Sequence, residues 1–141
     1  VIVEGKAAGP VYLWLQDGRA EIRDAAHLWG LTTGEAQEAI RAELGDQAIR
    51  VSAIGLGGEN RSRLACIIND LHHAAGRGGL GAVMGAKNLK AVAARGTKPV
   101  AAAAPERVKA VNRWLAEHFR ELAWHFPDIG RPKCCRRTAH P

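Results

Sequence analysis

Two spacings of hydrophobic residues run along this chain, and each predicts a different kind of element. VYLWLQ (11–16) and RAEIRDA (19–25) are short stretches bounded by turn residues, as β-strands are. They are separated by Asp17-Gly18, a pair typical of two-residue hairpin turns. The pattern therefore predicts a β-hairpin, with residues 1–7 as a further strand ahead of it.

A helical spacing begins at Thr32. Thr32 followed by Glu35 matches a capping box, in which the two side chains satisfy backbone groups at the helix start. Gly45 is the residue type expected just beyond a helix end. Apolar residues between these signals fall on one face, namely Ala36, Ile40 and Leu44. We therefore predict a helix between Thr32 and Gly45.

The middle of the chain returns to short apolar runs separated by glycine. Strands are predicted at 48–55, 63–70 and 89–96, with a loop at 55–60 and a short helix near 80–88. This mixture predicts an α+β fold, in which a β-rich domain carries short helices.

The composition changes near residue 97. TKPVAAAAP is typical of a linker, which we place at 98–105, after a first domain that covers 1–97. Pro105 and Glu106 suit the first turn of a long helix, predicted at 106–126. Its apolar residues repeat at three-and-four spacing: Val108, Val111, Leu115, Phe119, Leu122 and Phe126. An amphipathic helix needs a partner surface, so this one is predicted to open a second, helical domain.

Composition excludes several classes of protein. The chain has 141 residues, of which 47% are hydrophobic, enough for one domain with a core. The formal net charge is +6, yet four of the 20 basic residues and none of the 14 acidic ones lie in the last eleven positions. Because no basic-aromatic motif is present, nucleic-acid binding is not predicted. No apolar run approaches the roughly 18 residues of a membrane helix, so no membrane association is predicted.

The cysteines and histidines do not form a recognisable metal site. Three cysteines make no disulfide framework and favour a reducing, cytoplasmic location. Cys66 lies in the apolar run LACIIND and is expected to pack as a small hydrophobe, while Cys134 and Cys135 lack the C-x-x-C spacing of cluster ligands. His72 and His73 are adjacent, so their side chains diverge on most backbones and a shared metal is not predicted.

The stretch AAGRGGLGAVMGAKNLKAV (74–92) is the strongest candidate for chemistry. Gly76, Gly78 and Gly81 match the dinucleotide fingerprint G-x-G-x-x-G, but the helix that follows is short and the next acid is Glu106. A Walker loop fails as well, because the glycines are wrongly spaced and no Ser or Thr follows the lysine. Neither nucleotide motif is therefore predicted.

Two interpretations of this glycine-rich stretch stay open on the residues alone. Glycines let the backbone approach an anion closely, and Arg77 offers a planar fork of donors for a phosphate or a flat heterocycle. The alternative is a turn packed under a sheet, with Arg77 in solvent. Composition favours neither interpretation.

Longer motifs resemble a known family. IGLGGEN (54–60), then RLACIIND and AAGRGGLGAVMGAKNLKAVAARG, are similar in order and spacing to the N-terminal domain of the aldehyde:ferredoxin oxidoreductases, which use tungsten or sometimes molybdenum. GPVYLWLQDGRAEIRDAAHLWG resembles the preceding segment, so the resemblance covers residues 1–125. It implies a β-rich base on which a metal bis-pterin cofactor sits, covered by two mainly helical domains.

The resemblance also implies roles for single residues. Arg77 is expected to contact the pterin phosphate, with Gly78 against it and the Gly78 carbonyl on a magnesium ion that bridges the cofactor phosphates. Gly81 is expected to allow close backbone approach, and Asn60 to contribute from the second motif. For Asn60 and its neighbour Glu59, the capping of local amides is an equally good alternative.

The implied activity belongs to a longer protein. The resemblance implies oxidation of aldehydes to carboxylic acids, with oxygen from water and electrons passing through a 4Fe-4S cluster to ferredoxin. This chain carries no predicted catalytic residue and no cluster ligand, so it is expected to be an inactive fragment. A further pterin-binding segment is expected upstream of residue 1. The intact protein is expected to form a homodimer. The alternatives are a truncated non-catalytic product and a related tungsten enzyme that acts on an aromatic coenzyme A thioester.

The last residues break the pattern. Residues 127–141 are predicted to be disordered, because RPKCCRRTAHP after Gly130 offers no apolar face. The resembled family continues with Gly-Thr-Ala and more helix, and GC-rich codons for Arg-Pro-Lys-Cys-Cys-Arg-Arg, shifted by one nucleotide, encode Thr-Ala-Lys-Val-Leu-Pro-Ala. A frameshift just after Gly130 is therefore predicted. Resequencing of the locus tests it.

Overall fold

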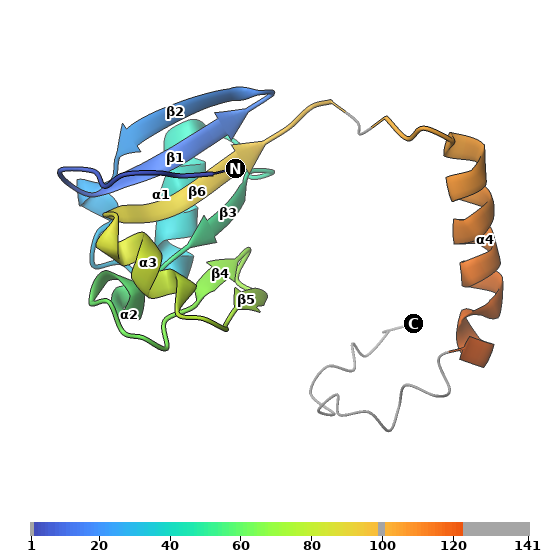
Figure 1. The fold of residues 1–141 in the computed structure, drawn as a ribbon. Helices are drawn as coiled ribbons and strands as arrows, with labels where there is room; N and C mark the ends of the chain where they lie inside the picture. Colours follow the sequence, from blue (N-terminus) through green and yellow to red (C-terminus); the bar gives the residue numbers. More distant parts are fainter. Residues whose placement is uncertain (1, 99–100, 123–141) are drawn as a thin grey trace. The chain divides into compact units, whose positions relative to one another are not determined.

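A computed structural model describes residues 2–98 and 101–122. The chain divides into two units, Val1–Lys98 and Pro99–Pro141, and each is described by itself. Figure 1 shows a sheet with short helices in the first unit and one long helix in the second. The α+β fold predicted from the sequence is confirmed.

The first unit is built on a six-stranded mixed sheet with the strand order β2-β1-β6-β3-β4-β5. The β1–β6 pair is parallel, and the other neighbours are antiparallel. Strand β6, the last in the chain, therefore lies between β1 and β3. The strands are β1 (Val11–Gln16), β2 (Arg19–Asp24), β3 (Arg50–Ala53), β4 (Ile67–Asn69), β5 (His73–Ala75) and β6 (Leu89–Arg95).

The β1–β2 hairpin forms as predicted. Gln16 pairs with Arg19, and the two residues between them, Asp17 and Gly18, have positive φ angles of 47° and 93°. Positive φ at both central positions is the geometry that Asp-Gly favours in a two-residue hairpin. The Asp17 carboxylate also accepts a hydrogen bond from the Thr97 N–H at 2.8 Å, which ties this turn to the residues just after β6.

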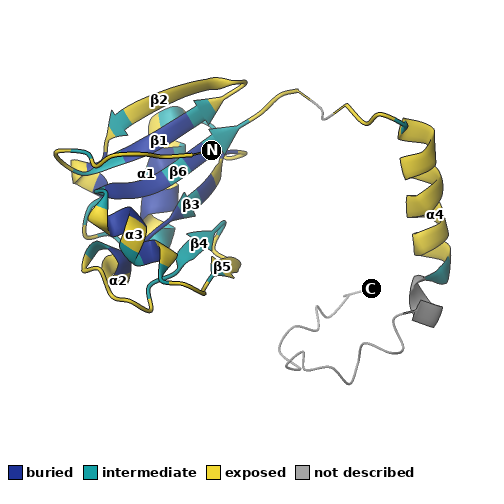
Figure 2. Ribbon diagram, viewed as in Figure 1, coloured by how far each residue is buried: buried dark blue, intermediate teal, exposed yellow. Residues whose placement is uncertain are grey.

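Helix α1 (Thr33–Leu44) covers one face of the sheet. The Thr32–Glu35 capping box is present and Gly45 ends the helix with a φ of 69°, both as predicted. Ile40 is buried in the main core, and Figure 2 shows the central strands of the sheet as the most buried part of the unit. The other buried members of this core are Tyr12, Trp14, Ala25, Leu28, Ile49, Val51, Ala53, Ala91 and Ala93.

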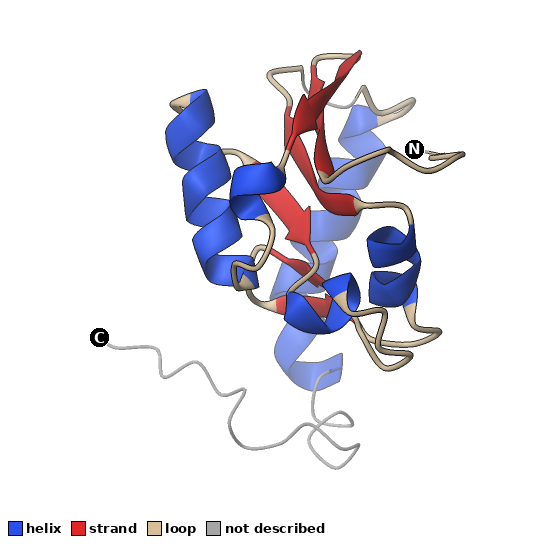
Figure 3. Ribbon diagram, turned by 90° about the vertical axis from the view of Figure 1, so that its left-hand side faces the viewer, coloured by secondary structure: helices blue, strands red, loops and turns tan. Residues whose placement is uncertain are grey.

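The opposite face of the sheet is only partly covered. Helix α3 (Leu80–Ala86) contributes Met84 to a smaller core with Leu13, Ile54 and Leu89. Seen from the side in Figure 3, helices flank the strands on both sides. Strand β2 extends beyond this cover, and most of it is exposed in Figure 2.

The strand predicted at residues 1–7 is wrong for the described part, residues 2–7, which form no strand. This segment makes separate hydrogen bonds to the turn before β6: Ala7 N–H donates to Lys87 O at 3.1 Å, and Lys87 Nζ donates to Gly5 O at 2.8 Å. An apolar segment becomes a strand only where a neighbour offers a ladder of backbone partners, and these contacts do not make one.

The loop predicted at 55–60 is also wrong, because it contains a short helix, α2 (Leu56–Glu59). Glycine is a poor helix former, so the sequence LGGE gives little local reason for helix. The helix is held by tertiary contacts of Gly58 and Glu59, which belong to the candidate site described below.

The strand predicted at 63–70 is shorter than expected, since only β4 is formed there. Ahead of β4 the chain turns, with Ala65 N–H donating to Ser62 O at 2.9 Å. After β4, Asp70 and Leu71 take positive φ angles and lead into β5, a strand that the sequence did not indicate. Predicted strands at 48–55 and 89–96 and the helix near 80–88 are confirmed with ends shifted by a few residues.

The second unit contains helix α4 (Pro105–Leu122), within the stretch where a long helix is predicted. Its apolar side chains are exposed where they are described: Val108, Val111, Trp114 and Leu115. The opening of a second domain by this helix stays a prediction, and the expectations for Phe126 and for 127–141 lie outside the described residues. In the described part of the chain, no helix combines the length and the apolar character that a membrane crossing requires.

Candidate functional site

Three of the four predicted site residues lie on two connections that touch each other, and the fourth, Gly81, lies in α3. Asn60 belongs to the connection between α2 and β4, and Arg77 and Gly78 belong to the turn between β5 and α3. The two connections meet where Gly79 lies against Arg63: a Cβ on Gly79 would be 2.6 Å from the Arg63 carbonyl oxygen. The fold thus brings together residues from both sequence motifs.

The turn Gly76–Gly79 presents bare backbone to open space. Gly78 has a φ of +79°, in the left-handed region, and a Cβ built on it would meet no atom within 4 Å. A Cβ built on Gly76 would likewise meet no atom within 4 Å, and Arg77 between the two glycines is exposed. A backbone without side chains, next to an available guanidinium, suits a flat ligand that carries phosphate.

Gly81 has a different environment from Gly78. It is buried in α3, and a Cβ on it would lie 2.6 Å from the Cys66 carbonyl oxygen and 2.8 Å from the Ala65 carbonyl carbon. Its N–H donates to the Ala65 oxygen at 3.0 Å. The absence of a side chain at Gly81 is therefore explained by packing within the chain, and its predicted contact with a cofactor stays a prediction.

Helices α2 and α3 touch through their backbones. A Cβ on Gly85 would lie 1.9 Å from the Gly58 carbonyl oxygen, and one on Gly58 would lie 3.0 Å from the Gly81 oxygen. Gly81 and Gly85 are four residues apart, so they share one face of α3. This glycine spacing is a sequence signal for helix packing that the ligand-based interpretation missed.

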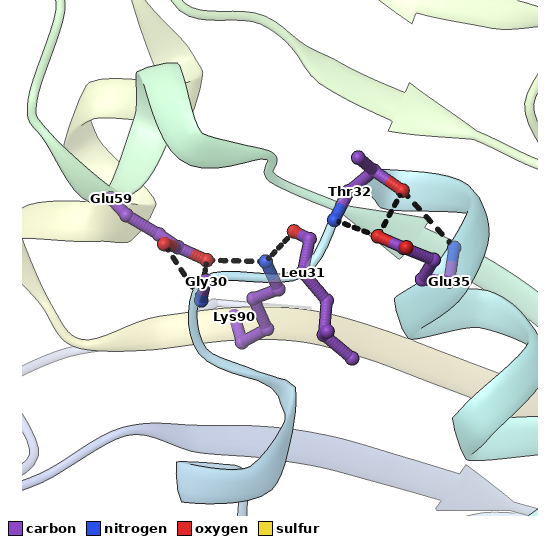
Figure 4. A network of polar contacts seen from close by, with 6 residues as sticks. All are labelled: Gly30, Leu31, Thr32, Glu35, Glu59 and Lys90. Atoms are coloured by element: carbon purple, nitrogen blue, oxygen red, sulfur yellow. Dashed lines mark hydrogen bonds and ion pairs between the residues drawn. The ribbon is translucent and has the colours of Figure 1, made fainter.

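A buried polar network joins the end of α2, strand β6 and the segment ahead of α1, as Figure 4 shows. Both carboxylate oxygens of Glu59 accept from the Gly30 N–H, at 3.1 and 3.0 Å, and Glu59 forms an ion pair with Lys90 of β6. Lys90 Nζ also donates to the Leu31 carbonyl at 2.8 Å. The Lys90 and Glu59 side chains are 0% and 5% exposed, so these groups find their partners inside the protein.

The Glu59 carboxylate holds an amide, but that of Gly30, which is distant in sequence and not local as the structural alternative expected. Asn60 differs, because it is exposed and ends α2 as its C-cap residue. Lys90 was missed by the sequence analysis. The available signal was a lysine between Leu89 and Ala91, in a strand whose other residues are mostly apolar.

The start of α1 continues this polar region. The Thr32 hydroxyl donates to Glu35 Oε2 at 2.7 Å, and the Thr32 N–H donates to the same oxygen at 2.8 Å. The hydrogen bond from the Thr32 hydroxyl, and to a smaller extent that from the Thr32 N–H, holds the pKa of Glu35 below its ordinary value. Glu35 therefore stays ionised at neutral pH.

The surface around the two connections is basic. Arg61, Arg63 and Arg77 are exposed on them. Between residues 60 and 86 the only acid in the sequence is Asp70, which pairs with Arg50 at 3.3 Å and lies 3.6 Å from Arg41. Exposed guanidinium groups on both connections favour an anionic ligand here.

The described residues supply no metal cluster of their own: no three His, Cys, Asp or Glu side chains among them gather closely enough to hold an ion. His72 and His73, the second of which begins β5, are exposed.

Comparison with known proteins gives one family. Residues 1–96 match the model of the aldehyde ferredoxin oxidoreductase N-terminal domain. The tungsten-containing aldehyde ferredoxin oxidoreductase of Pyrococcus furiosus is 49% identical over 120 residues, which are 85% of this chain and 20% of that protein. The aliphatic sulfonate oxidoreductase WOR-like subunit of the same organism is 42% identical over 112 residues, 71% of this chain and 18% of that protein.

A solved structure shares the fold. The active site complex BamBC of benzoyl coenzyme A reductase, in complex with 1,5-dienoyl-CoA, matches with a TM-score of 0.81 and 40% identity, over 89% of this chain and 19% of that chain. The chain thus spans about a fifth of the length of the proteins that it matches.

Proposed function

The chain belongs to the aldehyde ferredoxin oxidoreductase family, and on that premise we propose that it supplies one wall of a tungsten bis-pterin site. The observation that carries this proposal is the turn Gly76–Gly79, whose backbone is open at Gly76 and Gly78 and whose Arg77 is exposed. The residues present fit a phosphate-bearing pterin, because the turn offers both close approach and a positive charge.

Each member of the site has a stated role in this proposal. Arg77 donates to a cofactor phosphate, and Gly78 lies against the pterin and offers its carbonyl to a magnesium ion. Asn60 contributes from the exposed end of α2. Gly81 holds α3 against Ala65 and Cys66 and so supports the turn from behind, which makes it the least direct contact of the set.

The full-length protein is proposed to oxidise aldehydes to carboxylic acids. When bound, the tungsten centre, or molybdenum in its place, supplies the redox chemistry, and the protein's task is to hold and orient the cofactor. A 4Fe-4S cluster and ferredoxin would carry the electrons, with the cluster ligands outside this chain. A cytoplasmic location and a homodimer complete the proposal.

A related substrate is the second candidate. The benzoyl coenzyme A reductase complex shares this fold at 40% identity, so an aromatic coenzyme A thioester is a defined alternative. The aldehyde enzymes are favoured because the identity to the Pyrococcus furiosus enzyme is 49%.

The test compares Arg77→Ala with Arg19→Ala in the full-length polypeptide, expressed with tungstate. Arg19 is an exposed arginine on β2, at the opposite edge of the sheet from β5, and is the control. A charge-assisted hydrogen bond contributes about 1.5–3 kcal/mol, or roughly 10- to 100-fold in binding. We expect Arg77→Ala to lose most of its tungsten, measured by mass spectrometry, while the cofactor-free variant melts at the same temperature as the cofactor-free wild type.

Full tungsten content in Arg77→Ala would show that this arginine is only a solvated loop residue. Equal losses in both variants would point to a general effect of charge and not to a phosphate contact.

A further inference from the structure

One interior ion pair joins three segments that are far apart in the sequence. Glu59 ends α2, Lys90 lies in β6, and both contact the connection at Gly30 and Leu31 ahead of α1 (Figure 4). Removing one partner of a buried pair leaves an uncompensated charge in the interior, which is strongly destabilising. The pair is therefore a fixed junction, unlike an ion pair at the surface.

Lys90 stands at an irregularity in β6. The register between β1 and β6 passes from Val11–Leu89 to Tyr12–Ala91, so Lys90 has no partner in β1. A bulge of this kind redirects a side chain out of the strand's alternation. The Lys90 carbonyl accepts from the Ile54 N–H at 3.0 Å, just before α2. Lys90 thus holds the chain on both sides of α2, through its backbone before the helix and through Glu59 at the end.

Backbone contacts link this junction to the turn Gly76–Gly79. Gly58, next to Glu59, lies so close to α3 that a Cβ on Gly85 would be 1.9 Å from the Gly58 oxygen. Helix α3 begins directly after the turn. Because no side chain lies between the helices at this contact to absorb a displacement, a shift of α2 is passed on to α3 and to the turn.

We propose that Glu59 and Lys90 are a positioning pair, which sets the place of α2 and α3 and so of the turn that carries Arg77. The structural half of this proposal concerns the chain alone. Its consequence for cofactor retention rests on the function proposed above.

The structural half is tested on the 141-residue chain by amide hydrogen exchange and urea unfolding. The variants are Glu59→Gln, Lys90→Met and the double variant, which removes both charges at similar volume. Asp46→Asn is the control, because it breaks the half-buried pair between Asp46 and Arg95, 2.7 Å apart, in the same unit. The reporters are the N–H groups of Ser62 and Gly81, which donate to Gly57 and Ala65, compared with amides of the β1–β6 ladder.

For Glu59→Gln we expect the unfolding equilibrium constant to rise roughly 100-fold or more. Under conditions where the variant stays folded, exchange at Ser62 and Gly81 should accelerate at least about tenfold more than in the ladder. The double variant should recover most of the stability, since it buries no lone charge, yet keep the fast exchange at these two amides. Asp46→Asn should leave exchange at Ser62 and Gly81 unchanged relative to the ladder, whatever it costs in overall stability.

Two results would overturn the proposal. One is equal acceleration at the reporters and in the ladder for Glu59→Gln, which describes a pair that only stabilises the whole unit. The other is a double variant in which wild-type exchange at Ser62 and Gly81 returns together with stability.

The cofactor half uses the double variant in the full-length polypeptide, at matched folded concentration. A tungsten content well below wild type supports positioning, and wild-type content overturns this half. If wild-type protein itself takes up no tungsten, the proposed function fails, while the exchange result still decides the structural half.

Discussion

At the scale of single residues, glycine serves different purposes at neighbouring positions of this site. A side chain at Gly78 would meet no neighbouring atom, so only its φ of +79° favours glycine. At Gly79 both conformation and contact favour glycine, since its φ is +65° and a Cβ would lie 2.6 Å from the Arg63 oxygen. Gly85 is helical, so only the contact with Gly58 excludes a side chain. Conformation and contact therefore make separable demands on the same residue type.

Substitution by alanine separates these demands. Gly85→Ala forces backbone apart at the contact of α2 and α3, and we expect a loss of about 2 kcal/mol or more in the free energy of unfolding. At Gly78 an alanine side chain meets no atom, so Gly78→Ala should cost only the strain of the left-handed conformation, about 1–2 kcal/mol in the free energy of unfolding. Gly34→Ala in α1, where a Cβ meets only Leu71 at 3.9 Å, is the control and should be neutral or stabilising. Urea unfolding measures all three, and a harmless Gly85→Ala contradicts the close contact.

The sequence could not distinguish these glycines. The Cys66 carbonyl excludes a side chain at Gly81, and the Gly58 carbonyl excludes one at Gly85. Both carbonyls belong to residues that are distant in the sequence. Arg77 and Gly78 were identified through a resemblance of long motifs; both are exposed, and their cofactor contacts stay a prediction. Lys90 was missed because a bulge, which strand alternation does not predict, places it in the interior.

At the scale of elements, the helix with local signals is the one that sequence predicts best. Helix α1 has its capping box three residues apart and its end at a left-handed Gly45, and both need only neighbouring residues. Helix α2 depends on contacts with α3 and Lys90, and β5 depends on pairing with β4, so local pattern could not show either. Residues 2–7 begin with Ile-Val, as a strand can, but lack the ladder that defines one.

The capping box makes a prediction about pH. The pKa of Glu35 is lowered by Thr32, so this contribution to stability is complete above the ordinary carboxyl pKa, near 4.5, and is lost as pH falls through the lower folded value. Thr32→Ala should cost about 1 kcal/mol at pH 7 and weaken the dependence of stability on pH below about 4.5. Thr32→Ser keeps the hydroxyl and is the matched control.

Urea unfolding between pH 2.5 and 7 checks this prediction. Parallel pH profiles for Thr32→Ala and the wild type would mean that Glu35 does not depend on its cap. Asp17 and Asp46 have lowered pKa values through Thr97 and Arg95, so all variants should keep some loss of stability in acid.

At the scale of the whole molecule, the first unit has one closed and one partly open sheet face. Helix α1 closes the first, whereas the second carries a groove of about 540 Å³ over β1 and β2. Its lining is mostly apolar and includes Ile2, Val3, Val11, Leu13, Leu15, Ile22 and Leu89. An open apolar surface of this kind binds hydrophobic dyes and promotes association.

Two substitutions on this face should behave oppositely. Ile22 is 72% exposed, so Ile22→Lys should leave the free energy of unfolding within about 0.5 kcal/mol and reduce the fluorescence of a bound hydrophobic dye. Leu13 is its cross-strand neighbour but is only 9% exposed, so Leu13→Lys buries a charge and should unfold the unit. Strong destabilisation by Ile22→Lys would show that the face is covered in solution.

The proposed division of the site across a longer protein leads to the last prediction. The chain spans about a fifth of its tungsten-containing relatives, and the cofactor contacts proposed for it come from two connections on one side of a sheet. A small set of exposed contacts cannot replace the water shell of a doubly charged phosphate ligand and also bear the entropy lost on binding. The 141-residue chain, expressed with tungstate and purified, should therefore hold less than roughly 0.1 tungsten per chain, although it folds. The full-length polypeptide, prepared in the same way, is the positive control. A content near one tungsten in the short chain would mean that these two connections are a sufficient site, and that the rest of the protein serves the reaction without retaining the cofactor.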